Sequence, residues 1–250
     1  MASTPVHYER RGAAALVTID RPERRNAVDA ETAALLRECL TRFEEDDGAR
    51  VLVLNGAGEA FCAGADLKAM DLDIDHPDGP MGFTRVTPSK PTIAAIGGWC
   101  LAGGFEIALW CDVRIATEDS TFGLFERRWG VPLIDGGTQR LPLVVGMGRA
   151  LELTLTGRPV DAAEAFRIGL VNEVVPPGEH VVRALEWAER LAAFPQETML
   201  ADRRAMLEGS RLPWREALEH EYRQGRAVME VAARGAARFA GGEGRHGSFE

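Results

Sequence analysis

Short apolar runs predict a series of buried strands in the first half of the chain. The runs cover residues 13–19, 51–54, 92–96 and 113–116, and they consist mainly of valine, isoleucine, leucine and alanine. Polar or glycine residues follow each run, which is typical of strands that end in turns. We therefore expect a sheet whose strands are mostly buried.

An apolar stripe at helical spacing separates the first two runs. Leu36, Leu40 and Phe43 recur at intervals of four and three residues, and Asp29 precedes them as a capping residue. Strand, helix and strand in this order favour an α/β fold.

The second half of the chain is mostly helical in pattern from residue 141 onward. Asp161 and Glu164 match a capping box, and residues 170–175 predict one more strand. We expect a frayed tail at 241–250 and helices at 179–193, 196–207 and 214–233.

Composition narrows the class of protein. The 250 residues are 46% hydrophobic and 27% charged, which is ordinary for a globular protein with a sizeable core. The net charge of −9 argues against nucleic acid or an anionic membrane as the partner and favours a small molecule. The four cysteines and five histidines show no ligand-like spacing, so we expect no metal and reduced thiols. Without a signal core or a membrane-length apolar run, a cytoplasmic location is expected.

The stretch 88–112 concentrates the candidate chemistry. Gly103 and Gly104 begin a short apolar helix, whose first N–H groups suit an oxyanion or a phosphate. Glu106 follows among apolar residues, where it is either a solvent-facing helix cap or a desolvated functional acid. Local sequence alone favours the cap.

Local sequence also offers ordinary explanations for two further acids. Glu126 precedes two arginines, which favours a surface ion pair, and Asp135 precedes a helix that it could cap. The small residues of 58–68 allow close backbone approach, and the Asp-, Pro- and Gly-rich segment 70–88 is the best candidate for a mobile segment over a site. Motifs for a serine nucleophile elbow, a phosphate loop and a zinc protease are absent from the sequence.

Three passages together resemble the enoyl-CoA hydratase/isomerase family, also called the crotonase family. They are Phe61–Lys68, then Lys90–Gly98 with Ala102–Glu106, and then Phe122–Arg140. Residues 21–28, 155–158 and 162–173 also fit, so the resemblance spans nearly the whole chain.

The resemblance implies an α/β fold of repeated ββα turns wound as a superhelix, the ClpP/crotonase fold. It implies that residues 1–190 form the core with the acyl-CoA site and that residues 191–250 form a helical trimerisation region. It also implies a homotrimer or a homohexamer, and no cofactor apart from the coenzyme A of the substrate.

By position, the resemblance implies two backbone donors and two catalytic acids. The N–H groups of Ala65 and Gly103 would form an oxyanion hole, and Glu106 and Glu126 would be the catalytic pair. Asp135 stands where the family usually has a small residue near the acyl group, and the residues expected along the coenzyme A are Arg25, Ala27, Ala63, Asp66, Leu67 and Lys68.

The implied reaction is syn hydration of a trans-2-enoyl-CoA through an enolate. Glu106 would help to activate the water that attacks C3, and Glu126 would protonate C2. Isomerisation of 3-enoyl to 2-enoyl thioesters, or other enolate chemistry, is the alternative, and a non-catalytic acyl-CoA-binding protein is a third hypothesis. Retention of both acids favours the hydratase. Ala102, Phe105 and Trp129 depart from the family's usual residues, so the acyl group is left open.

Overall fold

The computed structural model describes residues 4–244, and these form two compact units divided between Leu191 and Ala192. Of the predicted tail at 241–250, residues 245–250 lie outside the described residues. The strands are β1 (Val6–Arg11), β2 (Ala14–Ile19), β3 (Val51–Gly56), β4 (Ala60–Cys62), β5 (Thr92–Ile96), β6 (Trp99–Leu101), β7 (Val113–Thr117), β8 (Thr121–Gly123), β9 (Val160–Asp161) and β10 (Glu173–Val175).

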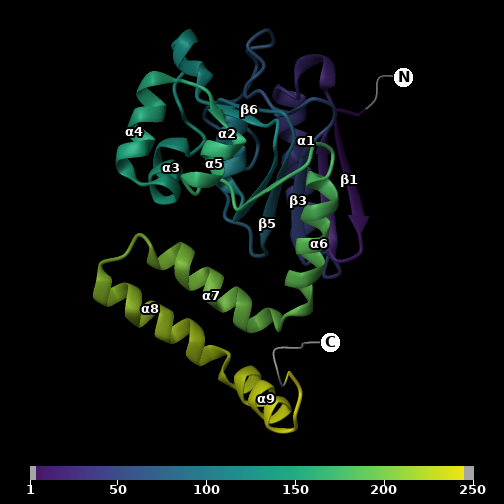
Figure 1. Ribbon diagram of the computed structural model, residues 1–250, viewed down its shortest axis with the longest axis vertical. Coiled ribbons are helices and arrows are strands. Elements are labelled where there is room, and N and C mark those ends of the chain that lie inside the picture. The colour runs from purple at the N-terminus through teal and green to yellow at the C-terminus, as the bar shows by residue number, and fades with distance from the viewer. Residues whose placement is uncertain (1–3, 245–250) are drawn as a thin grey trace. The chain divides into compact units, whose positions relative to one another are not determined.

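Helices alternate with these strands and then follow them (Figure 1). The α-helices are α1 (Ala30–Glu45), α2 (Gly103–Trp110), α3 (Gly137–Val145), α4 (Met147–Thr156), α5 (Ala162–Arg167), α6 (His180–Ala193), α7 (Gln196–Gly209), α8 (Trp214–Ala227) and α9 (Met229–Ala240). Two 3₁₀ segments, η1 (Pro22–Arg24) and η2 (Phe125–Trp129), complete the described elements. None of the described helices combines the length and the apolar character that a membrane span requires.

The first unit distributes its strands between two sheets. The larger sheet has the order β1-β2-β3-β5-β7-β10 and is parallel except for the pairing of β1 with β2. The smaller sheet has the order β4-β6-β8-β9. Each of the pairs β3–β4, β5–β6 and β7–β8 therefore places one strand in each sheet, and the last two pairs lead into α2 and into η2 with α3. This repeat confirms the expected ββα architecture.

The larger sheet is covered on both faces, which explains its continuous apolar strands. Along β3, Leu52 and Leu54 belong to the core that includes α1, whereas Val51 and Val53 pack in the core that includes α6. Side chains alternate between the faces of a strand, so β2, β3, β5 and β7 each contribute to both cores. Figure 1 shows α2, α3, α4 and α5 grouped on one side of this unit.

Several elements differ from the sequence-based expectation. Strands β4, β6, β8 and β9 have only two or three residues, which is too short for a periodic pattern, and β1 is mostly exposed. The expected strand 170–175 is shorter because only Glu173–Val175 pairs with β7. The expected helix 214–233 is two helices, since Val228 leaves the helical conformation between α8 and α9.

The second unit buries very little of its own surface. Among its described residues in α7, α8 and α9, only Ala201 and Gly209 are buried. Large apolar side chains are exposed along the same helices, namely Met206, Leu207, Trp214, Leu218, Tyr222, Met229 and Phe239.

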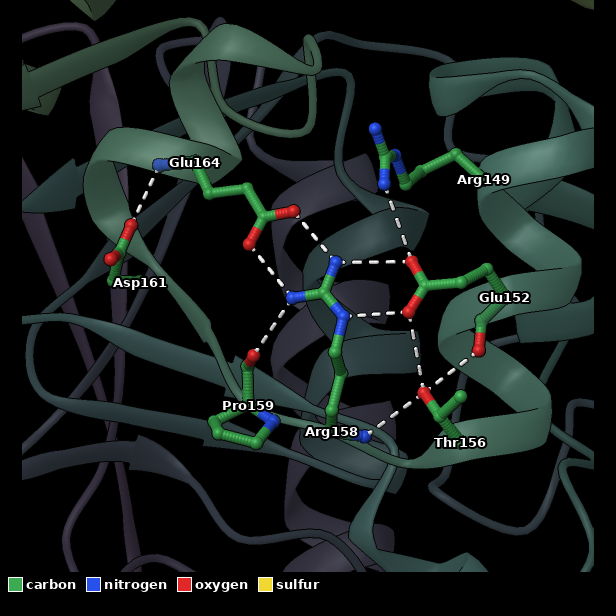
Figure 2. A network of polar contacts seen from close by, with 7 residues as sticks. All are labelled: Arg149, Glu152, Thr156, Arg158, Pro159, Asp161 and Glu164. Atoms are coloured by element: carbon green, nitrogen blue, oxygen red, sulfur yellow. Dashed lines mark hydrogen bonds and ion pairs between the residues drawn. The ribbon is translucent and has the colours of Figure 1, made fainter.

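Arg158 joins three elements of the first unit (Figure 2). Its guanidinium donates to Glu152 of α4 at 2.6 and 3.0 Å and to Glu164 of α5 at 2.8 and 2.7 Å. Arg149 adds one longer contact to Glu152, at 3.4 Å. Because Arg158 lies two residues before β9, the network fixes α4 and α5 to the edge of the smaller sheet.

We expect Arg158→Gln to lower the free energy of unfolding at neutral pH by about 1 kcal/mol, because partly exposed ion pairs are screened by water. Hydrogen bonds from Arg158 lower the pKa of both Glu152 and Glu164. Their stabilisation is therefore present above the ordinary glutamate pKa and is lost as the pH falls through the lowered values. Denaturant unfolding across this range should show the difference from the wild type shrinking in acid.

Arg149→Gln is the matched control, since it removes a single contact from the same network. Its effect should be smaller at every pH. Equal stability of Arg158→Gln and the wild type at neutral pH would show that the network contributes nothing.

Candidate active site

Two loops meet at the start of α2. A Cβ placed on Gly64 would lie 2.8 Å from the backbone N of Gly103, and a Cβ on Gly104 would overlap the carbonyl of Cys62. Gly64 also has a φ of 92°, which residues with a side chain rarely adopt. Glycine at these positions therefore allows the segment after β4 to lie against the first turn of α2.

The N–H group of Ala65 is left free by the bonds on either side of it. Val28 forms a parallel bridge with Ala65, in which Val28 N donates to Gly64 O and Asp66 N donates to Val28 O, both at 2.8 Å. In such a bridge the central residue directs its own N–H away from the partner. This places one of the two predicted oxyanion donors in an accessible position.

Gly103 is the first residue of α2, so its N–H has no acceptor within the helix. The preceding residue, Ala102, has φ 50° and ψ −126°, a strained conformation for alanine. Ala102 N donates to Gly123 O at 2.9 Å, which holds this residue against β8. The structure thus brings together the loops that carry both predicted donors.

Arg21 holds the Ala65 loop in place. Its guanidinium donates to the carbonyl of Ala27, and it forms ion pairs with Asp29 at 2.6 Å and Asp66 at 3.1 Å. Asp66 also accepts from the Lys68 amide at 3.0 Å. The predicted substrate residue Asp66 therefore uses its carboxylate within the loop. Arg21 was not predicted, since its role depends on partners up to 45 residues away.

Asn26 is a second residue that the sequence pattern missed. It is fully buried, has φ 56°, and its amide donates to Ala57 O at 2.8 Å and Ala60 O at 2.6 Å. This turn lets the carbonyl of Arg25 accept from Ala63 N at 3.0 Å. Arg25 and Ala63, two of the residues predicted along the coenzyme A, are therefore neighbours.

The side chains of these predicted substrate residues differ in exposure. Arg25, Leu67 and Lys68 are exposed, Ala63 is half-buried and Ala27 is buried. Two basic side chains are therefore available at the surface for an anionic ligand.

Glu106 is a buried acid rather than the solvent-facing cap that local sequence favours. Only 2% of it is exposed, because every residue of α2 is buried. Its Oε1 accepts from the amides of Asp135 at 3.1 Å and Gly137 at 2.7 Å. Burial raises the pKa of Glu106 to about 7; the Gly137 amide opposes this, and the nearby Asp135 and Glu126 carboxylates add to it.

Glu126 is also buried, so the expected surface ion pair is wrong. It is 6% exposed, and both carboxylate oxygens lack a hydrogen-bond partner among the described residues. The adjacent arginines point elsewhere: Arg127 donates to Thr154 O at 3.3 Å, and Arg128 stacks on Phe125. Burial raises the pKa of Glu126, against the effects of its own amide and of Arg127.

Asp135 is not the helix cap that its position suggests. Gly136 occupies the N-cap of α3, and the Asp135 carboxylate instead accepts from Met81 N at 3.1 Å and from the Thr84 hydroxyl. Residues 79–84, which lie within the segment 70–88 expected to be mobile, are buried. Burial raises the pKa of Asp135, which hydrogen bonds from Thr84 and Met81 partly oppose.

The three acids form one buried cluster beside the first turn of α2. Glu106 feels the charges of both Glu126 and Asp135, although the three come from separate elements. Carboxyl groups that share a dry environment disfavour joint ionisation, so one can accept a proton while another holds one. Within residues 4–244, no group of potential ligands is arranged to hold a metal ion.

We expect Glu106→Gln to gain stability relative to the wild type as the pH rises. The pKa of Glu106 is about 7 in the folded chain, above the ordinary value, so the folded state binds this proton more tightly. As the pH rises from the ordinary glutamate pKa to about 7, the wild type therefore loses stability, by roughly 3 kcal/mol in total, whereas the amide does not ionise. Urea unfolding from about pH 5 to about pH 8 measures the difference.

Exposed Glu118→Gln is the control and should follow the wild type at every pH. A constant difference between Glu106→Gln and the wild type would contradict the raised pKa.

Comparison with known proteins agrees with this geometry. The family model for enoyl-CoA hydratase/isomerase matches residues 9–245. A short-chain-enoyl-CoA hydratase from Clostridium acetobutylicum is 41% identical over 196 residues, which is 75% of either chain. The mevalonyl-coenzyme A hydratase of Aspergillus fumigatus is 37% identical over 213 residues, covering 82% of this chain and 77% of the relative. The crystal structure of an enoyl-CoA hydratase from Mycobacterium marinum is 34% identical and has a TM-score of 0.90, over 95% of this chain and 96% of that one. The chain therefore belongs to the enoyl-CoA hydratase/isomerase family and has the crotonase fold.

Proposed function

We propose that the protein is an enoyl-CoA hydratase that adds water syn across the C2=C3 bond of a trans-2-enoyl-CoA. The observation that carries this proposal is the buried pair of Glu106 and Glu126. One acid is oriented by two backbone amides, and the other is buried without a partner. Hydratases related to the chain support the same reaction class.

The amides of Ala65 and Gly103 are the proposed oxyanion donors. As water adds at C3, negative charge moves onto the thioester oxygen to give an enolate. Two preorganised N–H groups stabilise that charge, and losing one such donor typically costs about 10²- to 10³-fold in rate. The close contact of Gly64 with Gly103 N supports a shared position for the oxygen.

The two acids divide the proton transfers. Glu106, held by the amides of Asp135 and Gly137, accepts a proton from the water whose oxygen bonds to C3. Glu126, whose pKa burial raises, donates its proton to C2. One turnover therefore leaves Glu106 protonated and Glu126 ionised, and transfer of a proton from Glu106 to Glu126 through solvent restores the starting states.

The coenzyme A moiety is the proposed source of binding energy outside the reacting atoms. The exposed Arg25 and Lys68 supply positive charge for its phosphates at the edge of the loop that carries Ala65. A cytoplasmic role in acyl-CoA metabolism is part of the same proposal. The four cysteines, which are free thiols, support a reducing compartment.

We expect the purified protein to consume crotonyl-CoA, which is measured as a loss of the absorbance of the conjugated thioester. Glu106→Gln and Glu126→Gln should each lower kcat by at least about 100-fold, because each removes one positioned proton transfer. Glu118→Gln, an exposed substitution of the same kind, should retain full activity.

Offering a 3-enoyl-CoA in parallel separates the alternatives. Formation of the conjugated thioester without hydration would identify an isomerase that uses one acid as a shuttle. Binding of acyl-CoA without turnover of either thioester would identify a non-catalytic binding protein. An unchanged rate in either glutamine variant would refute the assigned roles.

We also propose that the protein is a homotrimer or a homohexamer assembled through its second unit. Exposed apolar side chains along α7, α8 and α9, with almost none buried within the unit, support this proposal. Family members with a helical C-terminal region assemble in this way according to the resemblance described above.

Light scattering coupled to size exclusion should give three or six times the mass of one chain. Leu218→Glu should shift the mass towards the monomer, because a charge would be buried in the interface. The neighbouring exposed Arg215→Glu controls for the added charge. A monomeric wild type would refute the assembly.

A further inference from the structure

We propose that Asp135 is a positioning residue that ties the 79–84 segment to the loop before α3 and thereby sets, through Met81, the size of the acyl group accepted beside Gly103. This inference rests on the proposed acyl-CoA function. It assigns a role to an acid that the hydration reaction itself does not use.

Asp135 contacts the 79–84 segment through its side chain. The carboxylate accepts from Met81 N at 3.1 Å and from the Thr84 hydroxyl. Arg140 completes the connection, since it donates to the carbonyl of Asp135 at 2.7 Å and to the carbonyl of Thr84. Asp135 and Arg140 together therefore hold both ends of the stretch 81–84.

Other contacts hold the segment from its remaining sides. A Cβ on Gly82 would overlap the carbonyl of Ala33 in α1, so the backbone lies directly on that helix. Phe83 packs edge-on against Trp110 of α2, with ring centroids 4.6 Å apart. Neither contact involves Met81, whose amide is held by Asp135. Asp135 is thus the residue best placed to control the position of Met81.

Met81 lies against the proposed oxyanion residue. A Cβ on Gly103 would overlap the terminal Cε of Met81, and Met81 is 3% exposed. The thioester carbonyl bound at the Gly103 amide would have this methionine as a neighbour. Methionine adapts its shape readily, so its effect on a ligand depends on how firmly its backbone is held.

Asp135 also contacts the proposed base. Its amide donates to Glu106 Oε1 at 3.1 Å, and its charge adds to the raised pKa of Glu106. The charged groups that face Asp135 from its surroundings are Glu106, Arg85 and Arg140. One residue therefore links the segment beside the acyl group to the acid that activates water.

Chain-length selectivity tests the tether. We would compare kcat/KM for crotonyl-, hexenoyl- and decenoyl-CoA in the wild type, Asp135→Ala, Met81→Ala and the double variant. Asp135→Ala should change the ratio of crotonyl- to decenoyl-CoA by about tenfold or more, mainly through KM, because the segment is released. In the double variant the ratio should match that of Met81→Ala alone, because coupled residues are not additive.

Three conservative variants exclude a merely structural role. Thr84→Val removes the hydroxyl and should reproduce part of the Asp135→Ala effect, whereas Thr84→Ser keeps the hydroxyl and should restore wild-type selectivity. Asp135→Asn keeps an acceptor for Met81 but removes the charge, so it should retain selectivity. It should also shift the Glu106-dependent acid limb of the pH profile to lower pH, because a neighbouring negative charge is lost.

Hydrogen exchange in the substrate-free protein gives an independent measurement. Amides 81–85 should exchange faster in Asp135→Ala than in the wild type, with no change in β3. Unchanged selectivity in Asp135→Ala, or an additive double variant, would overturn the inference even if hydratase activity is found. A wild type that hydrates no thioester would instead refute the proposed function, and the two failures are therefore distinguishable.

Discussion

The close approach of two backbone segments, at Gly64 and Gly103, is the constraint on which the site depends. Side chains are excluded from this contact, since a Cβ on Gly64 would lie 2.8 Å from the Gly103 nitrogen. The sheets supply the rigidity: β4 and β6 pair in parallel and deliver the two loops from the same edge. The Arg21 network then fixes one loop, while the buried helix α2 fixes the other. The geometry of the two proposed oxyanion donors therefore follows from strand pairing rather than from the side chains of the proposed catalytic acids.

Three buried acids lie beside this backbone contact. Glu106, Glu126 and Asp135 all have pKa values raised chiefly by burial. Such an arrangement opposes folding near neutral pH, because ionised carboxylates lose hydration on burial. The large two-sided core of the first unit offsets this cost, and function is a physical reason for a sequence to retain the cluster.

Sequence patterns were informative where local physics decides the structure. The strands β2, β3, β5 and β7 were predicted because their apolar runs are long enough to recognise, and α1 was predicted from its apolar stripe at helical spacing. Asp29 does cap α1, accepting from Thr32 N at 2.9 Å. Strands of two or three residues carry no such periodicity, and their existence depends on pairing with distant segments.

The same distinction applies to the candidate site. Local sequence assigned Glu126 and Asp135 to ordinary surface and capping roles, and both assignments were wrong because tertiary packing buries these acids. Only the resemblance to a family placed Glu106 and Glu126 together. Asp135 contacts Met81 and Thr84, which lie more than fifty residues away from it in sequence, so no local pattern indicated these partners.

Ala102 shows how much conformational free energy the proposed oxyanion region costs the folded chain. With φ 50° and ψ −126°, this alanine occupies a backbone region that glycine enters without penalty, at an expense of about 1–3 kcal/mol. Its methyl group lies 3.0 Å from where a Cβ on Gly64 would be, so it packs against the Gly64 loop directly before Gly103. The chain thus holds Ala102 in a strained conformation in its resting state, and the Gly103 N–H, which is the proposed oxyanion donor, has its direction set before any ligand arrives.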